Sequence, residues 1–546
     1  MSYKKTDYLL FTLIVAAILF LSVFCLTNTC YWGDDFAAYI SEGIAIAEGK
    51  FDEQVQLNVL MHPSELPDEA LKGSLVYVWG YPLLLALVYK LVGFDRVGFS
   101  SIIYYKLPSA IALALMAGVL FLLLRRRFGK PLSFMLAFLF SACYEFSVQI
   151  NTLYSDVVFL FFAALSLFVL ELFLDEKQET KKLVLGVLLG ISLWYTYETR
   201  LNGISILFAC ALACVIYYVK ARKEAPSGFN RKKLSATVIL PFIVFVVFKL
   251  VSEAILAPAT GNTSDLAGVT IQTVLKNIKG YYGNAKAWIE LICNNAAINW
   301  INIFLSMMTK TGEDTYGVIG SFCAKLSNIC AICVLILALI GIITDGFKKE
   351  AHLTVFAVVY LLVVSMLPYN QGVRYIYPVM LLVPIFAGHA IHRGIVLLTE
   401  HSSAKLKRIE NIIGFAVVSI ACILTFTSAV RGIIYERRTF DYVVPTGPES
   451  FYAMYAYTTC SIETYNYISE NTPKDCVIGF YKPRALYLNT ERVSLRTDIN
   501  GHSLDEVDYF LTCARMGEEQ LLKEGNGQFE EIFSNIEFTL YKRTSK

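Results

Sequence analysis

Two adjacent carboxylates, Asp34 and Asp35, are the first residues whose type and spacing suit catalysis. They follow the first long apolar run and are flanked by Tyr31, Trp32 and Phe36. Aromatic neighbours withdraw water from a carboxylate, which raises its pKa and allows it to act as a general base. Aspartate at the start of a helix also acts as a cap. The residue types alone leave both interpretations open.

A further carboxylate, Asp156, follows Ser155 and stands directly before a long apolar run. A charge at the edge of an apolar segment is costly, which makes it a functional candidate. Serine followed by aspartate is also typical of a helix N-terminus, where the helix dipole favours negative charge. Asp156 is therefore either a helix cap or a third acidic residue of a site.

Two arginines occur in short polar stretches between apolar runs. Arg200 follows Glu198, and Arg374 precedes Tyr375 and Tyr377. Glu198 and Arg200 can form a simple ion pair, or Arg200 can face a phosphate, whose oxygens fit a planar guanidinium. The tyrosines beside Arg374 are also typical of the aromatic belt at a membrane surface.

The composition is that of a membrane protein. Of the 546 residues, 56% are hydrophobic and 17% are charged, and the mean hydropathy is +0.54. Soluble chains are more charged and less apolar. The net charge of +2 gives no sign of a nucleic-acid partner. Many of the 13 cysteines lie in apolar runs, so we expect neither a zinc site nor a disulfide framework.

Apolar runs long enough to cross a bilayer recur along the chain. A spanning helix needs about 20 apolar residues, and on this basis we expect about 11 spans. The predicted spans are 8–27, 102–124, 131–150, 155–174, 183–197, 201–219, 235–256, 321–344, 352–368, 373–391 and 411–430.

Alternate short loops between these spans are rich in lysine and arginine. Basic short loops stay in the cytoplasm, so we place the N-terminus inside. An odd number of spans then puts the C-terminal tail outside, together with the long connections 28–101 and 257–320. The basic loops are 125–130, 177–182, 220–233, 348–349 and 405–408.

The tail, 431–546, is polar and contains no predicted span. Segments 475–481 and 536–543 are predicted strands, and 463–473 is a predicted short helix. The fold class we predict is therefore an all-α polytopic membrane domain, 1–430, with a small C-terminal α/β extracytoplasmic domain.

The outer connection 257–320 contains an amphipathic segment, 271–292. Its apolar residues recur every three or four positions, with lysines elsewhere. This pattern predicts a helix that either lies in the membrane interface or caps the loop as a soluble helix.

In this topology the candidate acids and arginines all lie at the outer membrane boundary. That arrangement suits an anionic substrate embedded in the membrane and met from outside. Arginines would hold a phosphate, and an aspartate would take a proton from an attacking hydroxyl. His62 lies in a loop on the same side and precedes a proline, which favours a structural role.

At these residues the sequence resembles the GT-C membrane glycosyltransferases, in the branch of protein O-mannosyltransferases, lipid A aminoarabinose transferases and Rgt-like bacterial enzymes. The similarity extends almost from end to end, and its strength lies in the order and spacing of the motifs. The matching segments are DDFAAYI (34–40), WGYPLLLALVYKLVG (79–93), LYSDVVFLFF (153–162), TRLNGI (199–204), RYIYPVMLLVPIFAG (374–388) and the tail 465–494.

The resemblance implies transfer of a hexosyl or pentosyl group, with inversion, from a polyprenyl-phosphate donor to a hydroxyl of a lipid, glycan or protein. It implies that Asp34 is the general base, with Asp35 as the alternative or helper. Asp156 would orient the acceptor, tune the pair or help to bind a metal. Relatives often have Asp-Glu in place of Asp34-Asp35, which makes the base assignment less specific.

Arg374 and Arg200 would hold the donor phosphate in such an enzyme. Many relatives carry a lysine or histidine where this chain reads Tyr77-Val78-Trp79, so one phosphate ligand of the family is missing. His62 and Lys72 are the candidate substitutes. The other candidate substrate-binding residues are Glu198, Tyr375 and Tyr81.

A divalent cation, Mg²⁺ or Mn²⁺, is compatible with paired carboxylates near a phosphate. If one is bound, Asp34, Asp35 and Asp156 are its expected ligands. We expect the protein in the plasma (inner) membrane. The alternatives are a secondary transporter or flippase of a lipid-linked or small substrate, and a surface polysaccharide ligase or polymerase.

Overall fold

The fold was analysed in a computed structural model, which describes most of the chain. The described residues are 3–28, 30, 34–61, 77–95, 101–224, 231–256, 270–293, 313–367, 372–399, 416, 419–420, 422–434, 456–497, 504–514 and 529–544.

Long apolar helices form most of the described structure. Six are long and apolar enough to cross a membrane, or up to eight if each of two bent pairs is one span. The pairs are α6 with α7 and α17 with α18, bent by 49° and 43°. The six helices are α1 (Lys5–Phe24), α5 (Ile102–Arg125), α8 (Asp156–Asp175), α10 (Ile204–Glu224), α11 (Arg231–Ile255) and α14 (Glu313–Gly341).

Ten of the 11 predicted spans overlap a helix or a bent pair, although not every one passes the same test of length and hydropathy. The last, 411–430, lies partly outside the described residues. The count of 11 therefore stays a prediction. The remaining segments are α6 (Lys130–Ser141), α7 (Tyr144–Asn151), α9 (Glu179–Thr199), α16 (Ala351–Ser365), α17 (Tyr377–Met380), α18 (Val383–Thr399) and the helix Cys422–Ile434.

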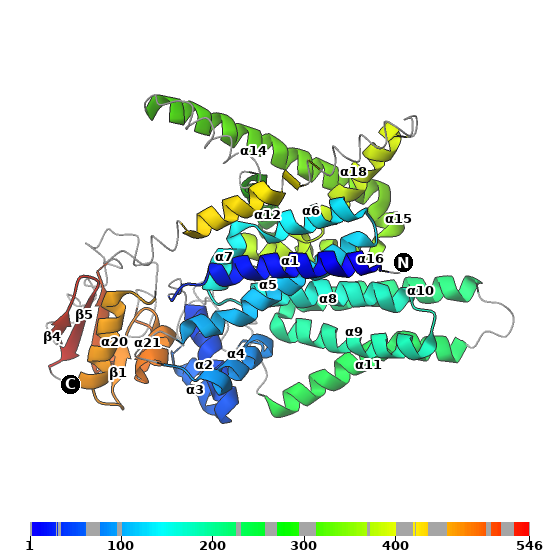
Figure 1. Cartoon of the computed structure of the whole chain (residues 1–546). Helices are drawn as coiled ribbons and strands as arrows, with labels where there is room; N and C mark the ends of the chain where they lie inside the picture. Colours follow the sequence, from blue (N-terminus) through cyan, green and yellow to red (C-terminus); the bar gives the residue numbers. More distant parts are fainter. Residues whose placement is uncertain are drawn as a thin grey trace.

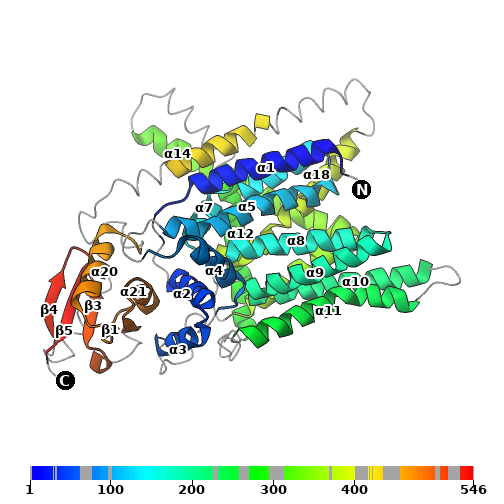
Figure 2. The same ribbon diagram turned by 60° about the horizontal axis from the view of Figure 1, so that its bottom comes forward.

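The long helices lie side by side as one bundle (Figures 1 and 2). Helix α5 packs between α1 and α8, and α9 packs against α8 and α11. Phe121, Phe159 and Leu167 are fully buried among them. The lipid-facing sides also stay apolar, as Leu250 at 61% exposure illustrates, because an apolar surface is stable in a bilayer.

Three helices of the predicted outer connection 28–101 lie at one end of the bundle. They are α2 (Asp34–Glu48), α3 (Phe51–Met61) and α4 (Gly80–Val92). Figure 2 shows them between the long helices and the C-terminal elements. Helix α2 packs along α4 and also contacts α3.

The predicted amphipathic helix is confirmed as α12 (Ile271–Cys293). On its buried face the Asn277 amide donates to the carbonyls of Ser365 and Leu367, at 3.1 and 2.7 Å. A second apolar stripe, which includes Ile271 and Leu275, is exposed. This exposed stripe is what an interfacial helix requires.

The C-terminal elements form a small α/β unit. The five-stranded sheet has the order β2-β1-β3-β5-β4, in which β1 is parallel to β2 and β3, and β5 is antiparallel to β3 and β4. The predicted strands and helix are present as β1, β5 and α20. The elements are α20 (Thr459–Asn471), β1 (Val477–Gly479), α21 (Pro483–Thr490), β2 (Val493–Leu495), β3 (Tyr509–Cys513), β4 (Phe529–Ser534) and β5 (Phe538–Arg543).

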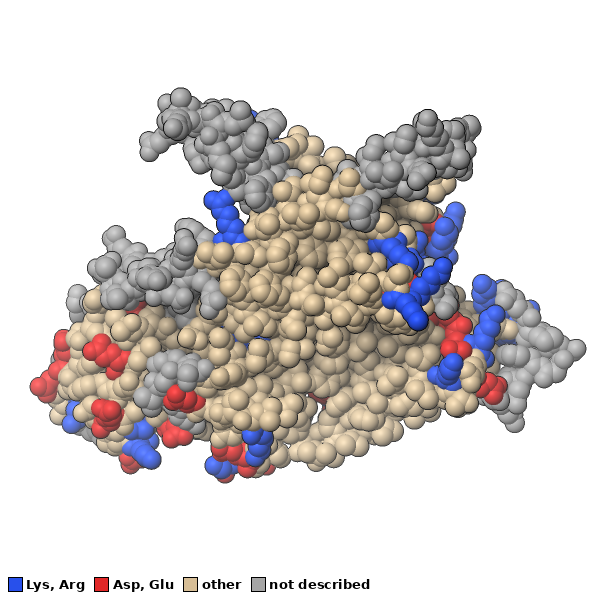
Figure 3. Space-filling view, viewed as in Figure 1, with Lys and Arg blue, Asp and Glu red and all other residues tan. Residues whose placement is uncertain are grey.

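Charged side chains gather at the two ends of the molecule. Figure 3 shows lysines and arginines, together with some acids, at the end opposite the α/β unit, and on this face a broad surface with few charged residues between the two ends. The helix ends at this basic end include those of α8, α10 and α15 (Phe347–Lys349) (Figure 1). The predicted fold class, a polytopic helical membrane domain with a small C-terminal α/β unit, is confirmed.

Candidate active site

The first carboxylate of the acidic pair contacts the α/β unit. Asp34 is the first residue of α2, and its Oδ1 accepts a hydrogen bond from the backbone N–H of Ala485, at 3.1 Å. Burial raises the pKa of Asp34, although Arg484 and Lys482 lower it. A carboxylate with a raised pKa is a better proton acceptor, which suits a general base.

The second carboxylate, Asp35, is linked to the bundle by contacts through two tyrosines. The Tyr77 hydroxyl donates to Asp35 Oδ1 at 2.8 Å. The rings of Tyr77 and Tyr39 have centroids 4.4 Å apart, and the Tyr39 hydroxyl lies 3.1 Å from Ser155 Oγ. Asp35 is therefore connected to the residue that precedes Asp156.

Asp156 forms a buried ion pair with Arg200 at the start of α8. Asp156 is 4% exposed, and its second oxygen, Oδ2, has no hydrogen-bond partner among the described atoms. Ser155 does not cap the helix through its side chain, because its hydroxyl faces Tyr39. The capping interpretation is thus wrong for Ser155, while Asp156 still lies where the helix dipole favours it.

The turn before Asp156 has an unusual backbone. Leu153 is a buried, non-glycine residue with φ of 56°, in the left-handed region. Such conformations are uncommon for leucine and persist where the surrounding structure over-determines them. Asn151 contributes to this restraint, since its amide donates to the Cys25 carbonyl at 2.9 Å. The segment that presents Asp156 is therefore held in one conformation.

Arg374 and Arg200 share one aromatic neighbour. The Arg200 Cζ lies 4.5 Å from the centroid of the Tyr375 ring, and the Arg374 Cζ lies 5.4 Å from the same ring. Arg374 also lies 4.6 Å from the Tyr154 ring. Within the described part of the chain, no ion pair or hydrogen bond joins Arg374 to a carboxylate. Its charge is therefore available to an anion.

The structure places two of the other three predicted site residues, Glu198 and Tyr81. Glu198 accepts from Lys249 Nζ at 2.8 Å and from Ser252 Oγ at 3.2 Å, so the alternative ion pair between Glu198 and Arg200 is wrong. Tyr81 is fully buried, with its ring centroid 5.1 Å from that of Tyr39. His62 lies outside the described residues.

Sequence reasoning missed several members of the site. Tyr39 is part of the DDFAAYI motif, one helical turn after Asp35, and that spacing was a usable signal. Tyr77 lies in the segment where many relatives carry a lysine or histidine. Arg484 carried no signal, because it lies 450 positions from Asp34 in a separate unit of the fold.

Another acid in α2 supports the position of Tyr77. Glu42 is fully buried, and its Oε1 accepts from the Tyr77 N–H at 3.1 Å and from Asn58 Nδ2 at 3.2 Å. Its Oε2 has no partner among the described atoms. Burial raises the pKa of Glu42 to about 8.

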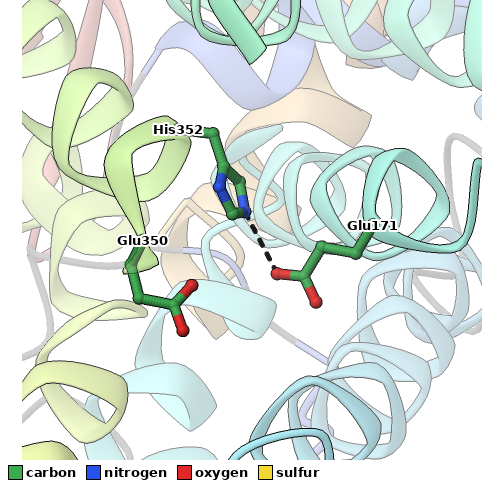
Figure 4. A group of neighbouring side chains, drawn as sticks. All are labelled: Glu171, Glu350 and His352. Carbon is green, nitrogen blue, oxygen red and sulfur yellow. Dashed lines mark hydrogen bonds and ion pairs between the residues drawn. The ribbon is translucent and has the colours of Figure 1, made fainter. Parts of the chain in front are cut away.

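The predicted metal ligands each have a different partner. Asp34 faces Ala485, Asp35 faces Tyr77 and Asp156 faces Arg200, so binding of a divalent cation by all three stays a prediction. The described residues do contain one other group with metal-ligand chemistry. Glu171, Glu350 and His352 offer ligand atoms within 4.8 Å of one another (Figure 4).

This group does not suit a cation. Arg127 donates from Nε to Glu350 at 2.7 Å and also pairs with Glu171, and Arg126 Nε lies 2.7 Å from Glu171. A divalent ion would be repelled by both guanidinium groups. His352 Nε2 lies 3.2 Å from Glu171 Oε1, as the dashed line in Figure 4 shows. The cluster is an ion-pair network that joins α8 to α16.

Comparisons with known proteins agree with this architecture. A family described as "Dolichyl-phosphate-mannose-protein mannosyltransferase" matches residues 79–247. Among proteins of curated function, none matches the sequence. The crystal structure of ArnT from Cupriavidus metallidurans bound to undecaprenyl phosphate is similar over 99% of this chain and 98% of that chain, at 12% identity and a TM-score of 0.54.

A second similar structure is the archaeal oligosaccharyltransferase AglB from Archaeoglobus fulgidus, in complex with an inhibitory peptide and a dolichol-phosphate. The similarity covers 98% of this chain and 74% of that chain, at 10% identity and a TM-score of 0.48. The predicted resemblance to GT-C membrane glycosyltransferases is confirmed at the level of the fold. The chain is a multi-pass membrane protein with a fold like that of ArnT.

Replacing Gly80 tests the packing beneath the site. A Cβ at Gly80, the first residue of α4, would lie 2.6 Å from the Glu198 carbonyl oxygen and 2.8 Å from the Thr199 nitrogen. We expect Gly80→Ala to cost about 1–3 kcal/mol, since both contacts are backbone. The loss of stability is measured from the melting temperature in detergent. Gly283→Ala is the control, because nothing lies within 4 Å there; equal melting temperatures would contradict the packing.

Arg127→Gln tests the ion-pair network. The change leaves two buried carboxylates without their main partner, and we expect a loss of about 3–5 kcal/mol. Lys50→Gln is the control, since Lys50 is 58% exposed and its partner Glu48 33% exposed, and exposed pairs contribute less than about 1 kcal/mol. Thermal unfolding would show the difference. Similar losses in the two variants would refute a buried network.

Glu42→Gln tests the buried acid through pH. With its raised pKa, Glu42 stays protonated in the folded protein while an ordinary glutamate, at 4.5, ionises on unfolding. Stability is therefore lost as pH rises from about 4.5 to about 8. We expect the melting temperature of Glu42→Gln, relative to that of the wild type, to rise across that window and to stay constant above it. The control is Glu48→Gln. A difference in melting temperature between Glu42→Gln and the wild type that does not change with pH would contradict the prediction.

Proposed function

We propose that the protein transfers a sugar from a polyprenyl-phosphate donor to an acceptor hydroxyl at the outer face of the membrane, with inversion. The observation that carries the proposal is the position of Arg374. Its guanidinium lies against Tyr154 and Tyr375, near the Asp156–Arg200 pair, and it has no carboxylate partner among the described residues. Such a cation suits a phosphate.

In the proposed reaction an aspartate of the pair takes the proton of the acceptor hydroxyl. The acceptor oxygen then attacks the anomeric carbon as the bond from that carbon to the phosphate oxygen breaks. Polyprenyl phosphate leaves with the bonding electrons, and Arg374 and Arg200 stabilise its growing charge. Asp34 is the first candidate base because burial raises its pKa. Asp35 is the alternative.

Asp156 is proposed to orient the acceptor. Its Oδ1 is held by Arg200, while Oδ2 has no partner among the described atoms. An incoming hydroxyl would satisfy that oxygen. The similar ArnT structure was solved with undecaprenyl phosphate, which supports a polyprenyl-phosphate ligand for this fold.

We further propose that the site faces outward from the plasma membrane. The short loops at the opposite end are basic, which is typical of a cytoplasmic face, and the α/β unit lies on the side of the acidic pair. A transporter or flippase would instead be expected to place its polar site near the bilayer midplane. A polysaccharide ligase or polymerase would use the same donor class, and the identity of the acceptor separates it.

The proposal is tested with a panel of polyprenyl-phosphate sugars. The purified protein in lipid is mixed with each radiolabelled donor and native membrane extract, and release of polyprenyl phosphate is followed. We expect one donor to be consumed by the wild type and the rate to fall about 100-fold or more in Asp34→Asn, as for loss of a general base. Glu48→Gln, on the exposed side of α2, is expected to behave as the wild type.

Other outcomes correct or overturn the proposal. Loss of activity only in Asp35→Asn would keep the reaction and move the base to Asp35. Movement of a labelled lipid across the bilayer without consumption would identify a transporter or flippase. Consumption that requires a polymeric glycan acceptor would identify the ligase or polymerase.

A further inference from the structure

The α/β unit is docked directly onto the segment that carries the acidic pair. The Ala456 N–H donates to the Cys30 carbonyl at 2.8 Å, and the rings of Phe36 and Tyr457 have centroids 6.0 Å apart. The Ala485 N–H, in the first turn of α21, donates to Asp34. Contacts from two separate parts of the unit, residues 456–457 and α21, thus converge on Cys30 and the start of α2.

Arg484 is the charged side chain that this docking brings to the site. It is 7% exposed, and its Cζ lies 5.9 Å from the centroid of the Tyr77 ring. A guanidinium removed from water is stable only when negative charge compensates it. Two carboxylates at the start of α2, Asp34 and Asp35, favour the charged form of Arg484.

The relationship is reciprocal. Arg484 and Lys482 lower the pKa of Asp34 against the effect of burial, and Asp34 and Asp35 in turn favour the charged form of Arg484. These acids lie on the same helix as Tyr39 and next to Tyr77, whose hydroxyl binds Asp35. The acidic face of α2 therefore obtains its counter-charge from a residue about 450 positions further along the chain.

We propose that Arg484 is a positioning residue of the active site, which balances the acidic face of α2 and holds Tyr77 against Asp35 when the α/β unit is docked. This inference rests on the proposed transfer reaction. It assigns the α/β unit a part in building the active site. Arg484 acts on catalysis through Asp34, Asp35 and Tyr77, whereas Arg374 and Arg200 are the proposed ligands of the donor phosphate.

The kinetic test compares Arg484→Met and Arg484→Lys with the wild type in the full-length protein. We expect Arg484→Met to lower kcat about tenfold or more, with KM for the donor within about threefold, because transition-state stabilisation is lost rather than donor binding. Arg484→Lys restores the charge and should recover part of kcat. Unchanged kcat, or a raised donor KM with unchanged kcat, would overturn the proposal.

The control is Arg543→Met, in the same unit but on β5. Arg543 donates to the Val507 carbonyl at 2.9 Å and lies against the Phe529 ring, at 5.1 Å. These contacts lie within the α/β unit, so the variant shares the cost of removing an arginine from that unit. We expect its kcat to match the wild type. An equal loss in both variants would assign the effect of Arg484 to the stability of the unit.

A second measurement does not depend on activity. In a double-mutant cycle, Arg484→Met and Asp34→Asn should together lower the melting temperature by less than the sum of the single changes, because they remove one shared interaction. Arg543→Met with Asp34→Asn should be additive. If the wild type consumes no donor, the proposed function fails while this cycle still tests the inference. Additivity in both cycles would overturn it.

Discussion

The ion pair between Asp156 and Arg200 is the interaction on which the candidate active site depends. It joins the start of α8 to the turn after α9, where burial would make an unpaired charge costly. Arg200 in turn stacks on Tyr375, which also contacts Arg374. Removing the pair would therefore free the three elements that hold the proposed phosphate site.

Helix α8 is fixed at both of its ends by the same physical rule. Its first residue pairs with Arg200, and Glu171 in its last turns pairs with Arg126 and Arg127. Buried charges in a membrane protein are tolerated when partners satisfy them. The two networks thus set where α8 begins and ends within the bundle. Of the two, only the pair of Asp156 with Arg200 leaves a carboxylate oxygen, Asp156 Oδ2, without a partner among the described atoms.

The fold class was predictable because lipid restricts the chemistry of the chain. The apolar runs predicted the helices of the bundle and the polar tail predicted the small α/β unit, while the orientation drawn from the basic short loops stays a prediction. Tyr77 and Arg484 were not found, since their roles come from contacts across the fold. The alternative ion pair of Glu198 with Arg200 was wrong for a similar reason: the partner of Glu198, Lys249, lies on the neighbouring helix α11, and spacing in sequence does not reveal it.

The most direct test of the account is the binding of undecaprenyl phosphate to the purified protein, followed by titration in native mass spectrometry. The account predicts that Arg374→Gln raises the Kd about tenfold or more, as expected for loss of a charge-assisted hydrogen bond. Arg393→Gln, at an exposed position of α18, should leave the Kd unchanged. Equal binding by the wild type and Arg374→Gln would contradict a phosphate site at the outer rim.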